Sequence, residues 1–199
     1  MEMQGNRSLA VTQQQAWDAL NDPEVLKASI PGCERLVATG ENQYAATVAV
    51  KIGPVAAKFS GRVQLSDVHA PNSYTLSFDG QGGAAGFGKG VSQVRLAPAT
   101  EGAGCELSYT VQAQVGGKIA QMGQRLIDGV ARSMAEDFFR RFDEEMQRRH
   151  PQAYVAAAQP GAAATSAPAS AAATGKGVPT WVWAAGAAVV VAAAYLLAR

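Results

Sequence analysis

The chain has 199 residues, enough for one domain of ordinary size, and its 17 Lys and Arg residues nearly balance its 16 Asp and Glu residues. A nucleic-acid-binding protein normally carries a basic stripe, so this balance argues against nucleic acid as a partner. The two cysteines, Cys33 and Cys105, and the two histidines, His69 and His150, lack the spacing of a metal site, so we expect reduced thiols in a cytoplasmic protein and no metal.

The first thirty residues predict one strand and two short helices. Residues 4–11 are expected to form the strand, and Thr12 is a suitable N-cap for the helical stretch QQQAWDAL. Asp22 and Pro23 open a second helix, which is expected to end before Pro31.

The middle of the chain alternates between apolar and polar residues. An alternation that leaves one face polar is typical of an antiparallel sheet with one solvated side. Turn residues at 53–54, 70–72 and 101–104 separate the alternating segments and suit hairpins. The positions predicted to share the core face are Tyr44, Ala46, Val48, Val50, Ile52, Ala57, Phe59, Gly61, Val63, Leu65, Tyr74, Leu76, Phe78, Cys105, Leu107, Tyr109, Val111, Ala113 and Val115.

A glycine-rich stretch, GGAAGFGKG at residues 82–90, nearly matches a phosphate-binding loop. The match fails because Gly90 stands where the motif needs Ser or Thr, and because the following VSQVRLAP alternates like a strand instead of opening a helix. We therefore reject nucleotide binding. The glycines at 86, 88 and 90 fall in register with the core-facing Ser92, so they either leave space for a cavity or allow the sheet to bend.

A long helix is predicted at about residues 118–149. Apolar residues recur there at spacings of three and four, which gives one continuous apolar stripe. The stripe consists of Ile119, Met122, Leu126, Val130, Met134, Phe138, Phe142 and Met146. The sheet can bury this stripe by curling around the helix, which predicts an α+β fold.

The C-terminal part changes in composition. Residues 151–177 are rich in Ala, Pro, Ser, Thr and Gly and predict a flexible linker, spanning roughly 30 Å on average. Residues 178–198 carry no charge, and as a helix they would span about 30 Å, the thickness of a bilayer's hydrocarbon core. Trp181, Trp183 and Tyr195 stand near the ends of this segment, as interfacial aromatic residues do. We expect a single-pass anchor in the cytoplasmic membrane, with the folded domain, 1–150, on the cytoplasmic side.

The order of elements resembles the helix-grip fold of the START/Bet v 1-like (SRPBCC) superfamily, a curved antiparallel sheet around a long C-terminal helix. Four strings, at residues 22–36, 50–65, 86–96 and 109–129, are similar to the CoxG family of carbon monoxide dehydrogenase proteins. The resemblance implies an accessory protein, associated with a molybdenum hydroxylase of the carbon monoxide dehydrogenase type and with its attachment to the membrane. It also implies a site for lipophilic molecules between the sheet and the last helix.

The first functional hypothesis is a tethered carrier of a lipophilic ligand such as a quinone, with no other cofactor. Methionines adapt to irregular apolar shapes, which suits such a site. The residues predicted to line the cavity are Phe59, Leu76, Phe78, Gly86, Phe87, Gly88, Gly90, Tyr109, Val111, Met122, Leu126, Val130, Met134 and Phe138.

Two other hypotheses compete with the carrier. A recruitment adaptor would need only the docking domain and the tail, because tethering alone raises the local concentration of the partner. An enzyme would need a positioned His or carboxylate, and the predicted inner faces offer only hydroxyls such as Tyr44, Tyr74 and Ser92. We therefore expect a protein without catalytic residues.

Overall fold

The computed structural model describes residues 1–100 and 104–158 of the chain. The predicted membrane segment, 178–198, with its Trp and Tyr residues, lies outside the described residues, as does most of the predicted linker. Among the helices that the structure describes, none is both long enough and apolar enough to cross a membrane.

Strands and helices follow one another along the described residues in the expected order. The elements are β1 (Glu2–Leu9), α1 (Gln13–Leu20), α2 (Pro23–Ser29), β2 (Cys33–Gly40), β3 (Gln43–Ile52), β4 (Val55–His69), β5 (Ser73–Gln81), the 3-10 turn η1 (Gly83–Ala85), β6 (Phe87–Pro98), β7 (Cys105–Gly116), the 3-10 turn η2 (Ala120–Met122), α3 (Gln124–Arg149) and α4 (Pro151–Ala157).

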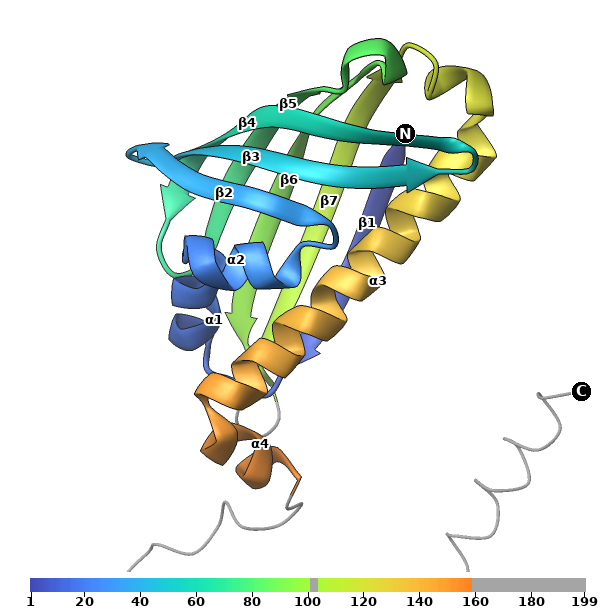
Figure 1. The fold of residues 1–199 in the computed structure, drawn as a ribbon. Helices are drawn as coiled ribbons and strands as arrows, with labels where there is room; N and C mark the ends of the chain where they lie inside the picture. Colours follow the sequence, from blue (N-terminus) through green and yellow to red (C-terminus); the bar gives the residue numbers. More distant parts are fainter. Residues whose placement is uncertain (101–103, 159–199) are drawn as a thin grey trace, which may run out of the picture. The chain divides into compact units, whose positions relative to one another are not determined.

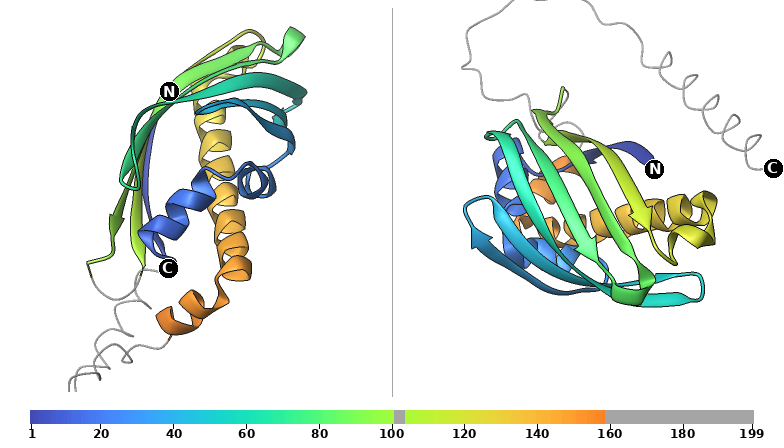
Figure 2. Two further views of the ribbon diagram at one scale, coloured as in Figure 1. Left: turned by 90° about the vertical axis from the view of Figure 1, so that its left-hand side faces the viewer. Right: turned by 90° about the horizontal axis from the view of Figure 1, so that it is seen from above.

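The seven strands form one antiparallel sheet in the order β1-β7-β6-β5-β4-β3-β2. The sheet curves, and α3 runs along its concave side, while α1 and α2 lie at one end of that side (Figures 1 and 2). This arrangement confirms the predicted α+β class and is consistent with the helix-grip fold.

The two predicted helix starts are confirmed by their caps. Thr12 and Gln15 form a capping box, in which the Gln15 N–H donates to Thr12 Oγ1 (3.3 Å) and the Thr12 N–H donates to Gln15 Oε1 (2.9 Å). At α2 the Glu24 N–H donates to Asp22 Oδ1 (2.8 Å), and Pro23 occupies the first helical position.

The last long helix begins later than its apolar pattern predicts. The pattern starts near residue 118, but η2 ends at Met122, the next residue Gly123 has a φ of 89°, and α3 begins at Gln124. A positive φ of this kind cannot continue an α-helix and favours glycine. Gly123 therefore separates Ile119 and Met122 from the helix to which the sequence assigned them.

The predicted linker also begins later than expected, because Pro151–Ala157 form α4. The hydroxyl of Tyr154 donates to the carbonyl oxygen of Asp143 (3.1 Å) and to its carboxylate, which fastens α4 to α3. Pro151 is tolerated because it stands at the first turn of the new helix, where its missing N–H has no partner to lose. The folded part thus extends beyond residue 150.

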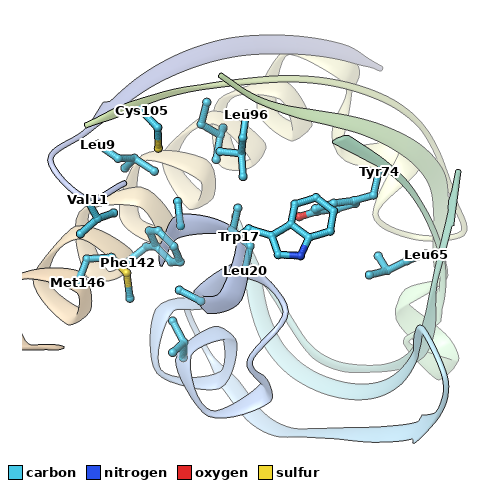
Figure 3. Close-up of a cluster of buried hydrophobic side chains, with 14 residues drawn as sticks. Leu9, Val11, Trp17, Leu20, Leu65, Tyr74, Leu96, Cys105, Phe142 and Met146 are labelled. Carbon is cyan, nitrogen blue, oxygen red and sulfur yellow. The ribbon is translucent and has the colours of Figure 1, made fainter. Parts of the chain in front are cut away.

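Two clusters of buried side chains hold α3 against the sheet. The first lies at the end near α1 and joins Trp17 and Leu20 to Phe142 and Met146 of α3, which are fully buried (Figure 3). The second lies near η1 and η2 and consists of Ile52, Ala85 and Ile119, with half-buried neighbours. Between the clusters Met134 of the stripe is only half-buried, and Leu126, at the end of α3 near the second cluster, is 38% exposed.

Candidate ligand-binding cavity

A cavity of about 250 Å³ lies on the concave side of the sheet, between α1, α2 and α3. Its lining comes from α1, from α2 and the residue after it, from six strands and from α3. The lining residues are Leu20, Leu26, Ile30, Leu36, Tyr44, Val63, Leu65, Tyr74, Leu76, Ser92, Val94, Leu107, Tyr109, Phe138 and Phe139. None of these side chains is charged, so the cavity is suited to an uncharged ligand.

The strand register explains why these side chains meet. Leu76 of β5 is the cross-strand partner of Ser92 on β6, and Tyr74 is the partner of Val94. Val94 is in turn opposite Tyr109 of β7. Because side chains of a strand alternate between the two faces, these partners all point to the concave side.

Aromatic contacts connect the sheet to α3 beside the cavity. The ring of Tyr109 stacks on Phe139 with 5.4 Å between centroids, and Phe138 contacts Phe139 edge to face at 5.1 Å. The guanidinium of Arg7 lies 5.3 Å above the Phe139 ring. Such pairs contribute on the order of 1 kcal/mol each, and they hold α3 at this distance from the sheet.

Hydroxyl groups supply the polar atoms of the lining. Tyr44 donates to the carbonyl oxygen of Asn21 (3.3 Å), and burial, followed by the charge of Asp22, raises the pKa of its hydroxyl. Burial raises the pKa of Tyr74 far above its usual value, with Tyr44 as a smaller cause. Both phenols therefore stay neutral at any pH that cells reach, and Tyr74 keeps a hydroxyl proton that it can donate to a ligand.

Comparison with known proteins identifies the family. The family model of the CoxG subunit of carbon monoxide dehydrogenase matches residues 5–147. The chain belongs to the CoxG family. This confirms the resemblance found in the sequence, and the match covers α1, α2 and nearly all of the sheet and of α3.

Solved structures confirm the superfamily fold for this CoxG member. A conserved protein from Geobacillus kaustophilus is 33% identical, with a TM-score of 0.70, and the match covers 75% of this chain and 97% of that chain. A Thermus thermophilus protein matches at 15% identity and a TM-score of 0.58 over 75% and 99% of the two chains. The Zhui aromatase/cyclase from Streptomyces matches at 12% identity and a TM-score of 0.55 over 75% and 94%. No protein of curated function matches the chain significantly.

Three of the residues predicted to line the cavity do so: Leu76, Tyr109 and Phe138. Val111 and Met134 are half-buried and lie outside the lining. That these residues bind a ligand stays a prediction.

Two glycines of the glycine-rich stretch, Gly82 and Gly90, contribute no space to the cavity, because aromatic rings cover them. A Cβ added at Gly90 would lie 2.8 Å from Cζ of Phe78, its cross-strand partner. A Cβ at Gly82 would lie 2.5 Å from the ring of Phe59. Phe59 and Phe78, which were also predicted to line the cavity, lie outside its lining and instead cover these two glycines, as an aromatic neighbour covers a glycine within a sheet.

The other residues of the glycine-rich stretch, Gly86 to Gly88, also lie outside the cavity lining. Gly86 has a φ of 123°, and a Cβ there would collide with the carbonyl oxygen of Gly116, while Gly88 faces Val115 without being part of the cavity. Phe87 was also predicted to line the cavity. The alternation of β6 turns it to the opposite face from Gly88, where it is 37% exposed and its ring lies over Gly116. The predicted strand after the glycines is confirmed as β6.

Three other predicted lining residues lie at the opposite end of α3. Met122 and Leu126 approach Gly53 in the turn between β3 and β4, each within 3.3 Å of a Cβ placed there. Val130 packs on the second buried cluster. They belong to the part of the concave side near η1 and η2, away from the cavity lining.

The part of the cavity wall that α1 and α2 form was not predicted from the sequence. Leu26 and Ile30 are four residues apart, a spacing that places both on one face at α2 and its C-cap, and Leu36 follows on β2. Phe139 lies one position off the predicted stripe of α3 and yet faces Tyr109. The apolar spacing in α2 was a usable signal, whereas the position of Phe139 depends on the angle at which α3 crosses the sheet.

No group of three His, Cys, Asp or Glu side chains within residues 1–100 and 104–158 is arranged to hold a metal ion.

Proposed function

We propose that this CoxG protein is a membrane-tethered accessory protein that carries an uncharged lipophilic ligand to a molybdenum hydroxylase of the carbon monoxide dehydrogenase type. The observation that carries the proposal is a mostly apolar cavity in a member of this family. Its lining includes a few hydroxyl groups and no charged side chain. The partner enzyme follows from the family description alone.

The size of the cavity favours a ring over a whole lipid. An apolar cavity of ~150 Å³ accepts a benzene ring, so about 250 Å³ suits one or two fused rings with small substituents. Pockets for complete drug-sized ligands are larger, roughly 300–1,000 Å³. A quinone with a long hydrocarbon chain fits this limit if the head group occupies the cavity and the chain extends out of it.

The tail completes the proposed role. The uncharged segment at 178–198 would anchor the chain in the cytoplasmic membrane, and the residues before it would let the domain reach an enzyme beside that membrane. A quinone carried in this way would connect the enzyme to the respiratory chain. The cavity lining offers no carboxylate or His as an acid or base, which supports carriage over catalysis.

The test is to isolate the full chain from cells, record whether it sediments with membranes, and extract the purified protein with organic solvent for mass spectrometry. We expect membrane association and a near-stoichiometric quinone or similar lipophile. The variant Val94→Phe fills the cavity and should lose that ligand. Val91→Phe is its matched control, because Val91 is on the same strand and is 45% exposed.

An empty wild-type protein that takes up no added quinone would leave the recruitment adaptor as the function. Equal ligand content in Val94→Phe and wild type would place the ligand outside this cavity.

A further inference from the structure

Two buried residues of the cavity wall carry hydroxyls that make no hydrogen bond within the described part of the protein. The side chains of Tyr74 and Ser92 are 6% and 9% exposed, and neither hydroxyl makes a hydrogen bond to any residue that the structure describes. Every fully enclosed polar side-chain atom of the described residues does have a partner. The oxygens of Tyr74 and Ser92 are therefore not fully enclosed, and both residues line the cavity.

Comparable hydroxyls elsewhere in the protein are satisfied. The fully buried Ser29 donates to the carbonyl oxygen of Val25 (2.8 Å), and Tyr154 donates to Asp143. Buried polar groups in folded proteins are almost always paired in this way, because an unpaired one loses its hydration without compensation. An apolar residue at position 74 or 92 would avoid this loss of hydration. The presence of two hydroxyls there therefore indicates a functional role for them.

The strand register brings the two hydroxyl-bearing residues together. Tyr74 on β5 is opposite Val94 on β6, and Ser92 is two residues before Val94, so Tyr74 and Ser92 are diagonal neighbours on the concave face. Diagonal neighbours lie roughly 7–8 Å apart, a distance that a long aromatic side chain bridges. The Tyr74 ring projects inward from its strand beside Trp17, with 5.6 Å between the ring centroids (Figure 3).

We propose that Tyr74 and Ser92 form a polar recognition point, at which a carbonyl oxygen of the ligand accepts hydrogen bonds from the two hydroxyls. The inference rests on the proposed function as a carrier and specifies its ligand class, a neutral ring with an oxygen acceptor. The apolar walls contribute affinity for any ring of suitable size, whereas the hydroxyls select the oxygenated one. Since Tyr74 stays neutral over the accessible pH range, its hydroxyl remains a donor.

The test compares two probes of equal shape on the full chain by isothermal titration calorimetry. The first probe is 2,3-dimethyl-1,4-naphthoquinone, whose substituted ring cannot add the thiol of Cys33, and the second is 2,3-dimethylnaphthalene. We expect wild type to bind the quinone several-fold more tightly. Tyr74→Phe and Ser92→Ala should each weaken quinone binding roughly two- to tenfold, the range for a neutral hydrogen bond, and leave the hydrocarbon unchanged.

Tyr154→Phe is the matched control, because it also removes a tyrosine hydroxyl, but one that lies outside the cavity. It should change the affinity for neither probe. The ligand-free Tyr74→Phe protein should melt at or above the wild-type temperature, since it loses an unpaired polar group. Equal affinity of wild type for both probes, or an equal effect of the variants on both, would overturn the recognition point and leave the carrier function standing. Binding of neither probe would overturn both.

Discussion

The two ends of the concave face use inward-facing strand residues in opposite ways. At the end near α1 and α2, which we call the cavity end, large side chains from six strands and three helices surround an open volume. At the end near η1 and η2, the glycine end, small residues face inward, yet Phe59 and Phe78 cover Gly82 and Gly90. Small inward-facing residues therefore do not make a cavity by themselves, because a neighbouring strand can supply a ring to fill the space.

The cavity end stays open because α3 is held in place on both sides of it. Phe139 contacts Phe138 and stacks on Tyr109 of the sheet, and these rings hold α3 away from the strands. The C-terminal end of α3 is fastened by Arg149, which pairs with Asp22 at the start of α2 (2.8 Å) and with the buried Glu145 of α3 itself. A helix fixed at both ends can span a gap that its own middle does not fill.

The largest expected effect distinguishes two glycines of β6 that face the same side. A Cβ at Gly90 would collide with the carbonyl oxygen of Gln112 and with Phe78, so Gly90→Ala should lower the free energy of unfolding by about 2–3 kcal/mol. A Cβ at Gly88 would make only an ordinary contact, 3.7 Å from Val115. Gly88→Ala should therefore change the free energy of unfolding by about 0.5 kcal/mol or less. Urea unfolding followed by circular dichroism measures both. Equal effects would show that Gly90 is not covered as described.

A smaller effect should come from the charge network at the cavity end. The hydrogen bond from Arg148, together with Arg149, lowers the pKa of Glu145 below its usual value, although burial opposes this. Glu145→Gln should lower the free energy of unfolding at pH 7 by about 2 kcal/mol. Because the folded pKa is depressed, the contribution of Glu145 is complete above the unfolded pKa, roughly 4.3, and disappears as the pH falls through the folded value.

Unfolding of wild type and Glu145→Gln across pH 3–8 checks this prediction, since the two stability curves should converge at the acid end. Glu144→Gln is the matched control. Its carboxylate is the exposed partner of Arg140, and such surface pairs contribute little. A constant difference between Glu145→Gln and wild type at all pH values would mean that the shape of the side chain, and not its charge, stabilises this end.

The smallest effect concerns single side chains of α3. Phe139→Leu keeps an apolar residue but loses the stacking on Tyr109 and the contact with Arg7, and should lower the free energy of unfolding by about 1 kcal/mol. Leu126→Gln, at the glycine end, should change it by about 0.5 kcal/mol or less because Leu126 is partly exposed. Thermal melting of both variants measures the two losses of stability side by side. A larger loss for Leu126→Gln would show that the glycine end holds α3 more firmly than the cavity end does.

Local chemistry made much of the fold predictable. Thr12 and Asp22 cap their helices through bonds to residues two or three positions away, and the alternation along β3, β4, β5 and β7 is a property of each strand alone. β2 was the hardest strand to predict from an apolar alternation, because Leu36 is its only buried residue. Gly123 ended the apparent periodicity of the last helix, because a backbone conformation does not appear in an apolar pattern.

The sequence by itself determined the class of fold, the family and the inward direction of Leu76, Tyr109 and Phe138, since period and resemblance are encoded along the chain. Only the tertiary structure decided which inward positions enclose a volume. Phe78 reaches Gly90 because the register of β5 and β6 makes them partners, and Leu26 becomes cavity wall because α2 packs against both β2 and α3. A cavity is the space left between elements distant in sequence, so its lining follows from how those elements pack and not from the pattern of any one of them.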